Sequence, residues 1–409
     1  MPPTLWADRD FVRFWIGQTA SQLGAQASQV TLPLIAVTTL GASAAQLGLL
    51  RAVQQAPILL FSLYFGALVD RSRARHVMVL SDLGRALVLG LIPIAFLLDS
   101  FGLSWLYAVA FVTGILMVSF DVAYQASLPR LIAREQLPQG NSLLEGSRSA
   151  AWICGPALGG GMMSLLTAPV AALGSGAFFV VSFLSLQRIQ RPDAPPPDPL
   201  QGGGMIRQIR AGLTLVARNV SLRTIAIASS VYQFSYAAVI TAYLLFLSRT
   251  LQLSGAELGL VLAASGPGAL LGSYFSASLP RRFGYGRVVI VAALISDVAM
   301  LCVPALDGSV VLLMVLNFLY GTFSQTVDIA TMAIRQTVTP LELQGRVVAT
   351  LNFLGLGLMP IGSLVGGVLA AHLGNRTALS LAALGLCLSP LTFLLSPLRK
   401  LRSVEGTVG

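Results

Sequence analysis

The chain has 409 residues, of which 55% are hydrophobic and only 10% are charged. Its mean hydropathy of +0.78 exceeds what the core of a soluble domain requires, so the composition excludes an ordinary soluble protein and indicates residence in a lipid bilayer. The formal net charge of +10 is compatible with binding to nucleic acid, and the positions of the basic residues must decide that question.

Twelve apolar runs are long enough to cross about 30 Å of hydrocarbon. They are predicted at 14–38, 46–68, 77–98, 104–124, 146–167, 170–188, 221–247, 255–279, 286–306, 309–332, 347–371 and 377–397. With the N-terminus inside the cell, most Lys and Arg residues fall in the inner loops, which is the positive-inside asymmetry of membrane proteins. We therefore expect a multi-pass protein of the bacterial inner (cytoplasmic) membrane with both termini in the cytoplasm, in contact with lipid and not with nucleic acid.

The first run carries a stripe of glutamines at intervals of four, four and three. They are Gln18, Gln22, Gln26 and Gln29. This spacing places them within about 80° on one helix face. Because neutral amides both donate and accept hydrogen bonds, the face is expected to line a polar cavity, with Gln22, Gln26 and Gln29 as substrate-binding residues. The alternative is that the amides join neighbouring helices, at about 0.6 kcal/mol per hydrogen bond.

Arg51 enters the second run beside Gln54 and Gln55, with no acidic residue within one helical turn. A charge at the centre of a membrane helix costs about 2.5–3.5 kcal/mol on an insertion scale, so Arg51 requires a partner. That partner is expected on another helix, on a substrate anion or among the outer headgroups. Arg51 and Gln55 are therefore included in the candidate substrate site.

Two acid–arginine pairs have a spacing of three residues, Asp82/Arg85 in the third run and Glu145/Arg148 at the start of the fifth. This spacing lets the two side chains of a pair meet on one helix face, which largely neutralises the charge. A structural role is expected for both pairs, and gating or proton coupling is the alternative for Asp82 and Arg85.

The longest polar interruption is RPDAPPPDPLQGGG at 191–204. The arginines that follow it predict a short basic helix on the inner membrane surface. We expect an N-terminal six-helix bundle over 1–190, a cytoplasmic linker over 191–219, a second six-helix bundle over 220–398 and a cytoplasmic tail over 399–409.

The two halves repeat similar segments in the same order. CGPALGG at 154–160 in the fifth run matches MPIGSLVGG at 359–367 in the eleventh. Such a repeat favours a central site where the halves meet. The expected fold is an all-α membrane protein with twelve transmembrane helices in two pseudo-symmetric bundles.

Three segments resemble the major facilitator superfamily, and the resemblance covers nearly the whole chain. The loop after the second run has the pattern G-x-x-x-D-R-x-x-x-[RK] at Gly66, Asp70, Arg71 and Arg75. The sequence GPALGG, with Gly155, Pro156, Gly159 and Gly160, resembles part of a motif of drug:proton antiporters. Residues 121–143 are similar to the twelve-span exporters that include macrolide and siderophore efflux proteins.

The resemblance implies roles for these residues. The family uses the acid of the loop motif, here Asp70, as a gate residue, and Arg71 and Arg75 belong to the same loop. The glycines of GPALGG allow close helix packing, while Pro156 removes a backbone donor and is expected to bend the helix.

In the family, the first, fourth, seventh and tenth spans line the central cavity. On the seventh, Tyr232, Tyr236 and Tyr243 fall within about 40° of one another, so we expect them to bind substrate, with packing or interfacial anchoring as the alternative. The chain departs from the family after Gly24, where Ala25 stands near the place of an acid that relatives often carry. This departure weakens a role for the first span in proton transfer.

Asp121 and Asp328 lie near the inner ends of the fourth and tenth runs, at nearly equivalent positions in the two halves. They are expected either to carry protons or to form latches with loop arginines. Those arginines are Arg71 or Arg75 in the first half and Arg281 or Arg282 in the second. The position of both acids near the cytoplasmic end favours the latch.

The sequence therefore predicts a monomeric secondary active exporter. It would move amphipathic organic molecules such as drugs, antibiotics or siderophores outward by alternating access, in antiport with protons as the coupling ion. A facilitator or importer of a lipid-like or small polar solute is one alternative, and a membrane sensor or scaffold without transport is another. No nucleophile–base–acid set and no metal-ligand spacing occurs, so we expect no enzyme activity, no cofactor and no metal.

Overall fold

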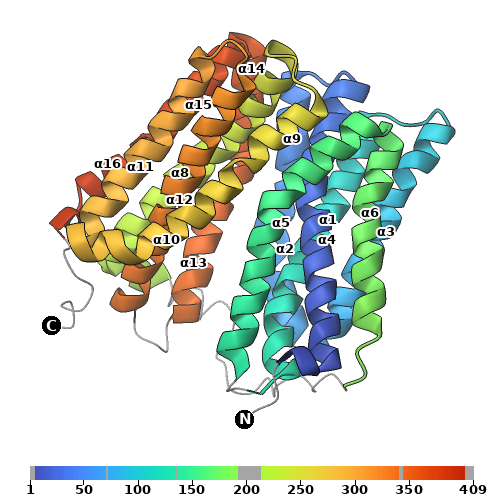
Figure 1. Cartoon of the computed structure of the whole chain (residues 1–409), viewed down its shortest axis with the longest axis horizontal. Helices are drawn as coiled ribbons and strands as arrows, with labels where there is room; N and C mark the ends of the chain where they lie inside the picture. Colours follow the sequence, from blue (N-terminus) through green and yellow to red (C-terminus); the bar gives the residue numbers. More distant parts are fainter. Residues whose placement is uncertain (1–4, 71, 134–135, 192–212, 340–343, 401–409) are drawn as a thin grey trace. The chain divides into compact units, whose positions relative to one another are not determined.

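The computed structural model describes residues 5–70, 72–133, 136–191, 213–339 and 344–400 (Figure 1). Within these ranges the chain is helical and contains no β-strand. Nine helical segments of the described residues are long and apolar enough to cross a membrane. The remaining predicted runs, at 14–38, 46–68 and 146–167, are helical as well. The all-α membrane fold predicted from hydropathy is confirmed.

The chain divides into two compact units. Unit 1 comprises Met1–Ala42, Val53–Gln201 and Ser254–Ala263. Its helices are α1 (Arg9–Leu34), α2 (Ala44–Asp70, from Val53 onward), α3 (Ala74–Leu97), α4 (Leu103–Leu131), α5 (Leu137–Leu165), α6 (Ala168–Gln187) and α9 (Gly255–Ala263). Helix α1 packs on α5 and α6, α3 packs on α4 and α6, and α5 packs on α9.

Unit 2 comprises Ser43–Ala52, Gly202–Leu253 and Ala264–Gly409. Its helices are α8 (Val220–Leu245), α10 (Ser265–Phe283), α11 (Tyr285–Cys302), α12 (Val310–Val338), α13 (Gln344–Leu356), α14 (Met359–Leu373), α15 (Asn375–Leu386) and α16 (Leu388–Leu394), together with the first residues of α2. Helix α12 packs on α10 and α11, while α8 packs on α13, α14, α15 and α16.

Two short segments differ from the predicted halves: residues 43–52 group with unit 2 and residues 254–263 with unit 1. The predicted linker at 191–219 and tail at 399–409 lie largely outside the described residues. Residues 213–218 are helical, and the basic interfacial helix stays a prediction.

Glycines bring helices α10 and α12 into close contact. A Cβ atom built at Gly268 would lie 2.2 Å from the carbonyl oxygen of Phe318, and one at Gly272 would lie 2.1 Å from that of Thr322. A larger side chain at either position would push the two helices apart. Close approach through small residues is the usual way that membrane helices associate, because lipid provides little hydrophobic drive between them.

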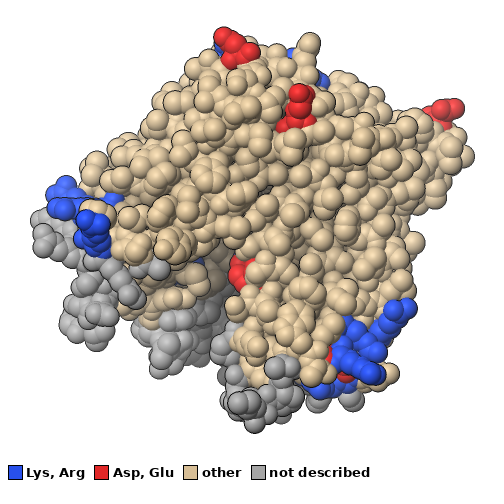
Figure 2. Space-filling model, viewed as in Figure 1, with Lys and Arg blue, Asp and Glu red and all other residues tan. Residues whose placement is uncertain are grey.

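Basic side chains gather at the end of unit 1 where α1 begins and α6 ends (Figure 2). Arg191 bonds there to Asp8 at 3.0 Å, and Asp10 accepts bonds from the backbone N–H groups of Gln190 and Arg191 at 3.1 and 2.9 Å. These contacts tie the start of α1 to the end of α6 outside the apolar part of the helices.

Candidate functional site

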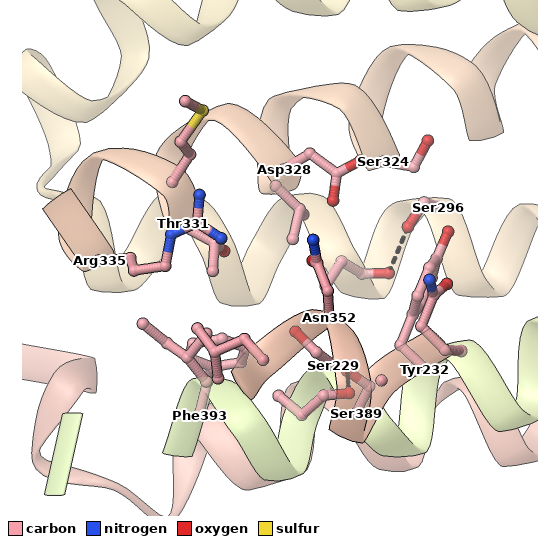
Figure 3. A pocket seen from close by; sticks show the side chains of 18 of the residues that line it. Ser229, Tyr232, Ser296, Ser324, Asp328, Thr331, Arg335, Asn352, Ser389 and Phe393 are labelled. Atoms are coloured by element: carbon pink, nitrogen blue, oxygen red, sulfur yellow. Dashed lines mark hydrogen bonds between the residues drawn. The ribbon is translucent and has the colours of Figure 1, made fainter. Parts of the chain in front are cut away.

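Unit 2 contains a cavity of about 240 Å³. It is lined from five helices, α8, α11, α12, α13 and α16. One part of its wall is apolar, with Ile225, Ala228, Val327, Met332, Leu351 and Phe393. The polar part carries Ser229, Tyr232, Gln233, Ser296, Asp297, Ser324, Asp328, Thr331, Arg335, Asn352 and Ser389 (Figure 3). A wall of this mixed character suits an amphipathic ligand.

Prolines break the helices that form part of this wall. Helix α13 ends at Leu356 and helix α15 ends at Leu386, four residues before Pro360 and Pro390 respectively. A proline has no N–H group to bond the carbonyl four residues earlier, so each helix stops at the carbonyl that has lost its donor. Irregular backbone at membrane depth is tolerated where it lines a cavity, and both breaks flank this one.

Three charged residues face the cavity. Asp328 and Arg335 are two turns apart on α12, and Asp297 comes from α11. Asp328 is solvent-accessible and points toward Asn352 across the cavity (Figure 3). Among the described residues neither Asp297 nor Asp328 forms an ion pair. The cavity therefore combines two unpaired carboxyl groups with one guanidinium.

Three buried polar atoms at this cavity have no hydrogen-bond partner within the described part of the chain. They are Asp297 Oδ2, Thr331 Oγ1 and Arg335 Nε. Asp297 is only 1% exposed, and its Oδ1 accepts a hydrogen bond from Ser296 Oγ at 3.3 Å. Buried polar groups in folded proteins are nearly always paired, so such a group marks a place where water or a ligand binds.

A stack of three tyrosines adjoins the cavity. The ring of Tyr236 lies parallel to that of Tyr232 at a centroid distance of 5.7 Å and to that of Tyr320 at 6.2 Å, and the hydroxyls of Tyr232 and Tyr320 share a hydrogen bond. Tyr232 lines the cavity directly. Tyr243 is different, because it is 1% exposed and accepts a bond from Asn317 at 2.6 Å. These contacts suit the packing alternative for Tyr243, and its contact with substrate stays a prediction.

Arg51 lies in the part of α2 that belongs to unit 2. Its side chain is 8% exposed, its Nε has no hydrogen-bond partner among the described residues, and it lies within electrostatic reach of Tyr236. The partner that the sequence requires for this charge is therefore not an acid of the described chain. Gln55 lies one turn further along the same helix, in the part of α2 that groups with unit 1, and its contact with substrate stays a prediction.

The glutamine stripe has several environments in unit 1. Gln18 is fully buried, and neither of its amide atoms has a partner among the described residues. Gln22 is partly exposed. Gln26 lies against α5, where a Cβ at Gly155 would come within 2.2 Å of the Gln26 side chain. Gln29 lines a small cavity of about 10 Å³, the size of one water molecule. Gln22, Gln26 and Gln29 are all partly exposed, and their contact with cargo stays a prediction.

The GPALGG segment lies at close helix contacts. A Cβ at Gly159 would lie 2.6 Å from the carbonyl oxygen of Ala27 on α1, and one at Gly160 would lie 2.2 Å from that of Gly255 on α9. Helix α5 continues past Pro156 to Leu165. The glycines therefore set the spacing of α5 against two neighbours, while the proline leaves the helix unbroken.

Asp82 and Arg85 form a buried cluster at the junction of α1, α3, α4 and α6. Asp82 accepts bonds from Arg85, from Ser182 and from Ser21, the last at 3.1 Å. The Arg85 guanidinium lies over the ring of Phe120 at 4.6 Å and over that of Phe179 at 4.3 Å. Asp82 is 0% and Arg85 2% exposed. This geometry favours the structural role for the pair over gating or proton coupling, whereas Glu145 and Arg148 meet at the surface.

The loop motif and the acid of α4 are placed only in part. Arg75 donates to the carbonyl oxygens of Ile189 and Arg191 at 3.1 and 2.7 Å, which ties the start of α3 to the end of α6. Arg71 lies outside the described residues, as do the side chains of Asp70 and Arg281 and the surroundings of Gly66. Asp121 is partly exposed and forms no ion pair with a described residue, so its predicted latch stays a prediction.

Several residues of the cavity were not singled out from the sequence. They are Asp297, Arg335, Asn352, Ser296 and Ser389. Asp297 had a visible signal, because it is the one acid in the apolar run 286–306, and an ionisable residue inside a membrane span marks a functional site by default. The polar uncharged residues had no such signal, since serine and asparagine are common on many helix faces.

Comparison with known proteins gives the family. A family model described as transmembrane secretion effector, within the major facilitator superfamily, matches residues 5–407. The multidrug efflux pump Tap of Mycolicibacterium fortuitum is 29% identical over 361 residues, which cover 84% of this chain and 86% of that protein. The Tap pump of Mycobacterium tuberculosis is 26% identical over 374 residues, which cover 88% of this chain and 87% of the relative.

Solved structures share the fold. The nucleoside transporter NupG matches with a TM-score of 0.76 at 11% identity over 94% of this chain and 99% of its own. A bacterial homologue of the iron transporter ferroportin, in an inward-facing state, matches with a TM-score of 0.74 at 15% identity over 94% of this chain and 98% of its own. At such identities the likeness concerns the fold alone. Because the family model matches almost the entire length of this chain, the chain belongs to the transmembrane secretion effector family of the major facilitator superfamily and is a multi-pass membrane transporter.

Proposed function

We propose that this protein is a secondary active exporter that moves amphipathic organic molecules out of the cell in exchange for protons. The observation that carries the proposal is the cavity of unit 2, which places two carboxyl groups without ion-pair partners among the described residues beside an apolar wall. The relatives named as multidrug efflux pumps support the direction and the broad class of cargo.

The cargo would bind in the unit 2 cavity. Phe393 and Met332 offer apolar surface, and Ser229, Gln233 and Asn352 offer hydrogen-bonding groups without charge. Uncharged donors and acceptors on flexible side chains tolerate varied polar groups, while the apolar wall gives affinity without directional demands. This combination suits a transporter that accepts several related molecules.

Protons would be exchanged at Asp328. Its carboxyl is accessible from the cavity, as the proton-carrier alternative requires. Each proton that enters across 100 mV supplies about 2.3 kcal/mol, corresponding to a roughly 50-fold concentration gradient of a neutral cargo at equilibrium. With both termini in the cytoplasm, as the distribution of basic residues favours, this proton flow would drive export.

Transport into inside-out membrane vesicles tests the proposal. Respiration acidifies the vesicle lumen, so an exporter that exchanges protons should accumulate a fluorescent amphipathic dye there. We expect uptake only in vesicles that contain the protein, and its loss on addition of an uncoupler. As a control, vesicles with an Asp307→Asn variant should accumulate the dye as the wild type does, because Asp307 is 84% exposed and lies outside the cavity.

Two results would contradict the proposal. Dye uptake that persists unchanged with the uncoupler would instead indicate a facilitator. Equal uptake with and without the protein across a broad panel of amphipathic compounds would remove the exporter assignment.

A further inference from the structure

The unit 2 cavity has an electrostatic asymmetry that the general exporter function does not require. Asp297 belongs to α11, a helix outside the set that the family resemblance assigns to the central cavity, and yet it lines the cavity wall. Its Oδ2 atom is buried and has no hydrogen-bond partner among the described residues. Removing an ionised carboxylate from water without a partner is strongly unfavourable, so this oxygen identifies a position at which a hydrogen-bond donor binds.

The surroundings of Asp297 indicate what kind of donor fits. Asp297 lines the same cavity as Tyr232, whose hydroxyl shares a hydrogen bond with that of Tyr320. Ser296, which bonds to Asp297, lies on the Tyr232 side of the cavity, and Arg335 lies on the opposite side (Figure 3). The Asp297 end of the cavity thus holds a carboxylate and an aromatic ring, and the only guanidinium among the described lining residues is at the other end.

A carboxylate beside an aromatic ring is a favourable environment for an organic cation. The carboxylate accepts a charge-assisted hydrogen bond from an ammonium N–H, and a tyrosine face attracts the same charge. The cavity volume of about 240 Å³ far exceeds the roughly 10–15 Å³ that one water molecule requires, so the space fits an organic group better than a bare metal ion. Among the described residues no three His, Cys, Asp or Glu side chains gather as a metal site.

We propose that the Asp297 end of this cavity is a subsite for an organic ammonium group, with Asp297 as its counter-ion and Tyr232 as the aromatic wall. This inference rests on the proposed function, since it names the charge of the cargo. A cationic amphiphile would place its ammonium at Asp297 and its apolar part toward Phe393 and Met332. Asp328, which is accessible from the cavity, remains free to exchange protons while Asp297 holds the cargo.

The test compares two molecules that differ in one charge. Doxorubicin carries an aliphatic ammonium group, and in N-acetyl doxorubicin the same nitrogen is a neutral amide. Binding of each to the purified protein in nanodiscs is followed by fluorescence anisotropy. For the wild-type protein we expect about tenfold tighter binding of doxorubicin than of the acetylated compound, as is typical for loss of one charge-assisted hydrogen bond.

Three variants locate the effect. Asp297→Asn is expected to weaken doxorubicin binding about tenfold and to change binding of the acetylated compound less than twofold. Asp297→Glu retains the charge and is expected to keep most of the preference. Asp307→Asn, which removes an exposed carboxylate of the same unit, is expected to change neither affinity. Thermal unfolding checks that each variant is folded, and Asp297→Asn is expected to be at least as stable as the wild type because it buries no unpaired charge.

The outcomes separate the inference from the proposed function. Equal affinity of the wild-type protein for the two compounds, or an unchanged preference in Asp297→Asn, would overturn the ammonium subsite even if vesicles accumulate dye against a proton gradient. A preference that disappears in Asp297→Asn would establish the subsite even if no proton-driven transport is found. The comparison of the two compounds on the wild-type protein needs no variant, so a folding defect cannot obscure the result.

Discussion

Replacing Arg85 with methionine isolates the contribution of the buried ion pair in unit 1. Methionine keeps much of the apolar stem and removes the guanidinium, so Asp82 retains only the hydroxyl bonds from α1 and α6. Arg148→Met is the matched control. Arg148 pairs with Glu145 at the same spacing of three residues and at 2.7 Å, but the two side chains are 55% and 59% exposed.

The expected loss follows from burial. Removing one partner of a buried ion pair costs about 3–5 kcal/mol because a charge remains unpaired, while an exposed pair contributes about 0–1 kcal/mol. Arg85 also lies over two aromatic rings, and each such contact contributes about 0.5–2 kcal/mol. We expect Arg85→Met to lower the free energy of unfolding by about 4 kcal/mol or more and Arg148→Met to lower it by less than about 1 kcal/mol.

A double variant separates charge from packing. In Asp82→Asn combined with Arg85→Met no charge is left in the cluster, so about half of the loss should be recovered. Unfolding by titration with a denaturing detergent, followed by tryptophan fluorescence, gives the free energies. The reasoning would be refuted if the Arg85 and Arg148 variants lost the same stability, or if the double variant were no more stable than Arg85→Met.

Two further predictions use neighbouring or equivalent residues as controls. Gly160→Ala should lower the thermal stability of the purified protein, because its Cβ would lie 2.2 Å from the carbonyl oxygen of Gly255. Gly161→Ala faces open space and should raise the stability by about 0.5–1 kcal/mol through helix propensity. Equal effects of the two substitutions would contradict the packing role of GPALGG. Tyr320→Phe should lower the free energy of unfolding by about 1 kcal/mol, because it removes the hydroxyl hydrogen bond in the tyrosine stack. Tyr274→Phe changes a side chain that is 75% exposed and should cause no measurable loss in the same unfolding assay.

The helices could be predicted from the sequence because a membrane imposes one strong requirement. Every span must satisfy its own backbone hydrogen bonds and present apolar surface over its length, and this leaves a clear hydropathy signal. The breaks within spans could also have been located, since Pro267, Pro360 and Pro390 each stand four residues after the last residue of α9, α13 and α15. Without structure, a proline that breaks a helix could not be told from Pro156, which α5 accommodates.

The candidate site was harder to predict because it depends on neighbours that no single helix reveals. The glutamines share one face of α1, but Gln26 packs against α5 and is only partly exposed, while the protein interior encloses Gln18. Periodicity gives the direction of a side chain and not what lies there. Asp297 lies outside the spans that the family resemblance assigns to the cavity, and the only sequence signal for it is a charge in an apolar run.

The exchange of cargo for protons through the unit 2 cavity is tested most directly by following the protons themselves. Inside-out vesicles with an acidic lumen and a trapped pH indicator would receive doxorubicin from outside. The account predicts that the lumenal pH rises as the compound enters with the wild-type protein, and that Asp328→Asn abolishes this rise. Entry of the compound with no change in lumenal pH, or an equal pH rise with Asp328→Asn, would contradict it.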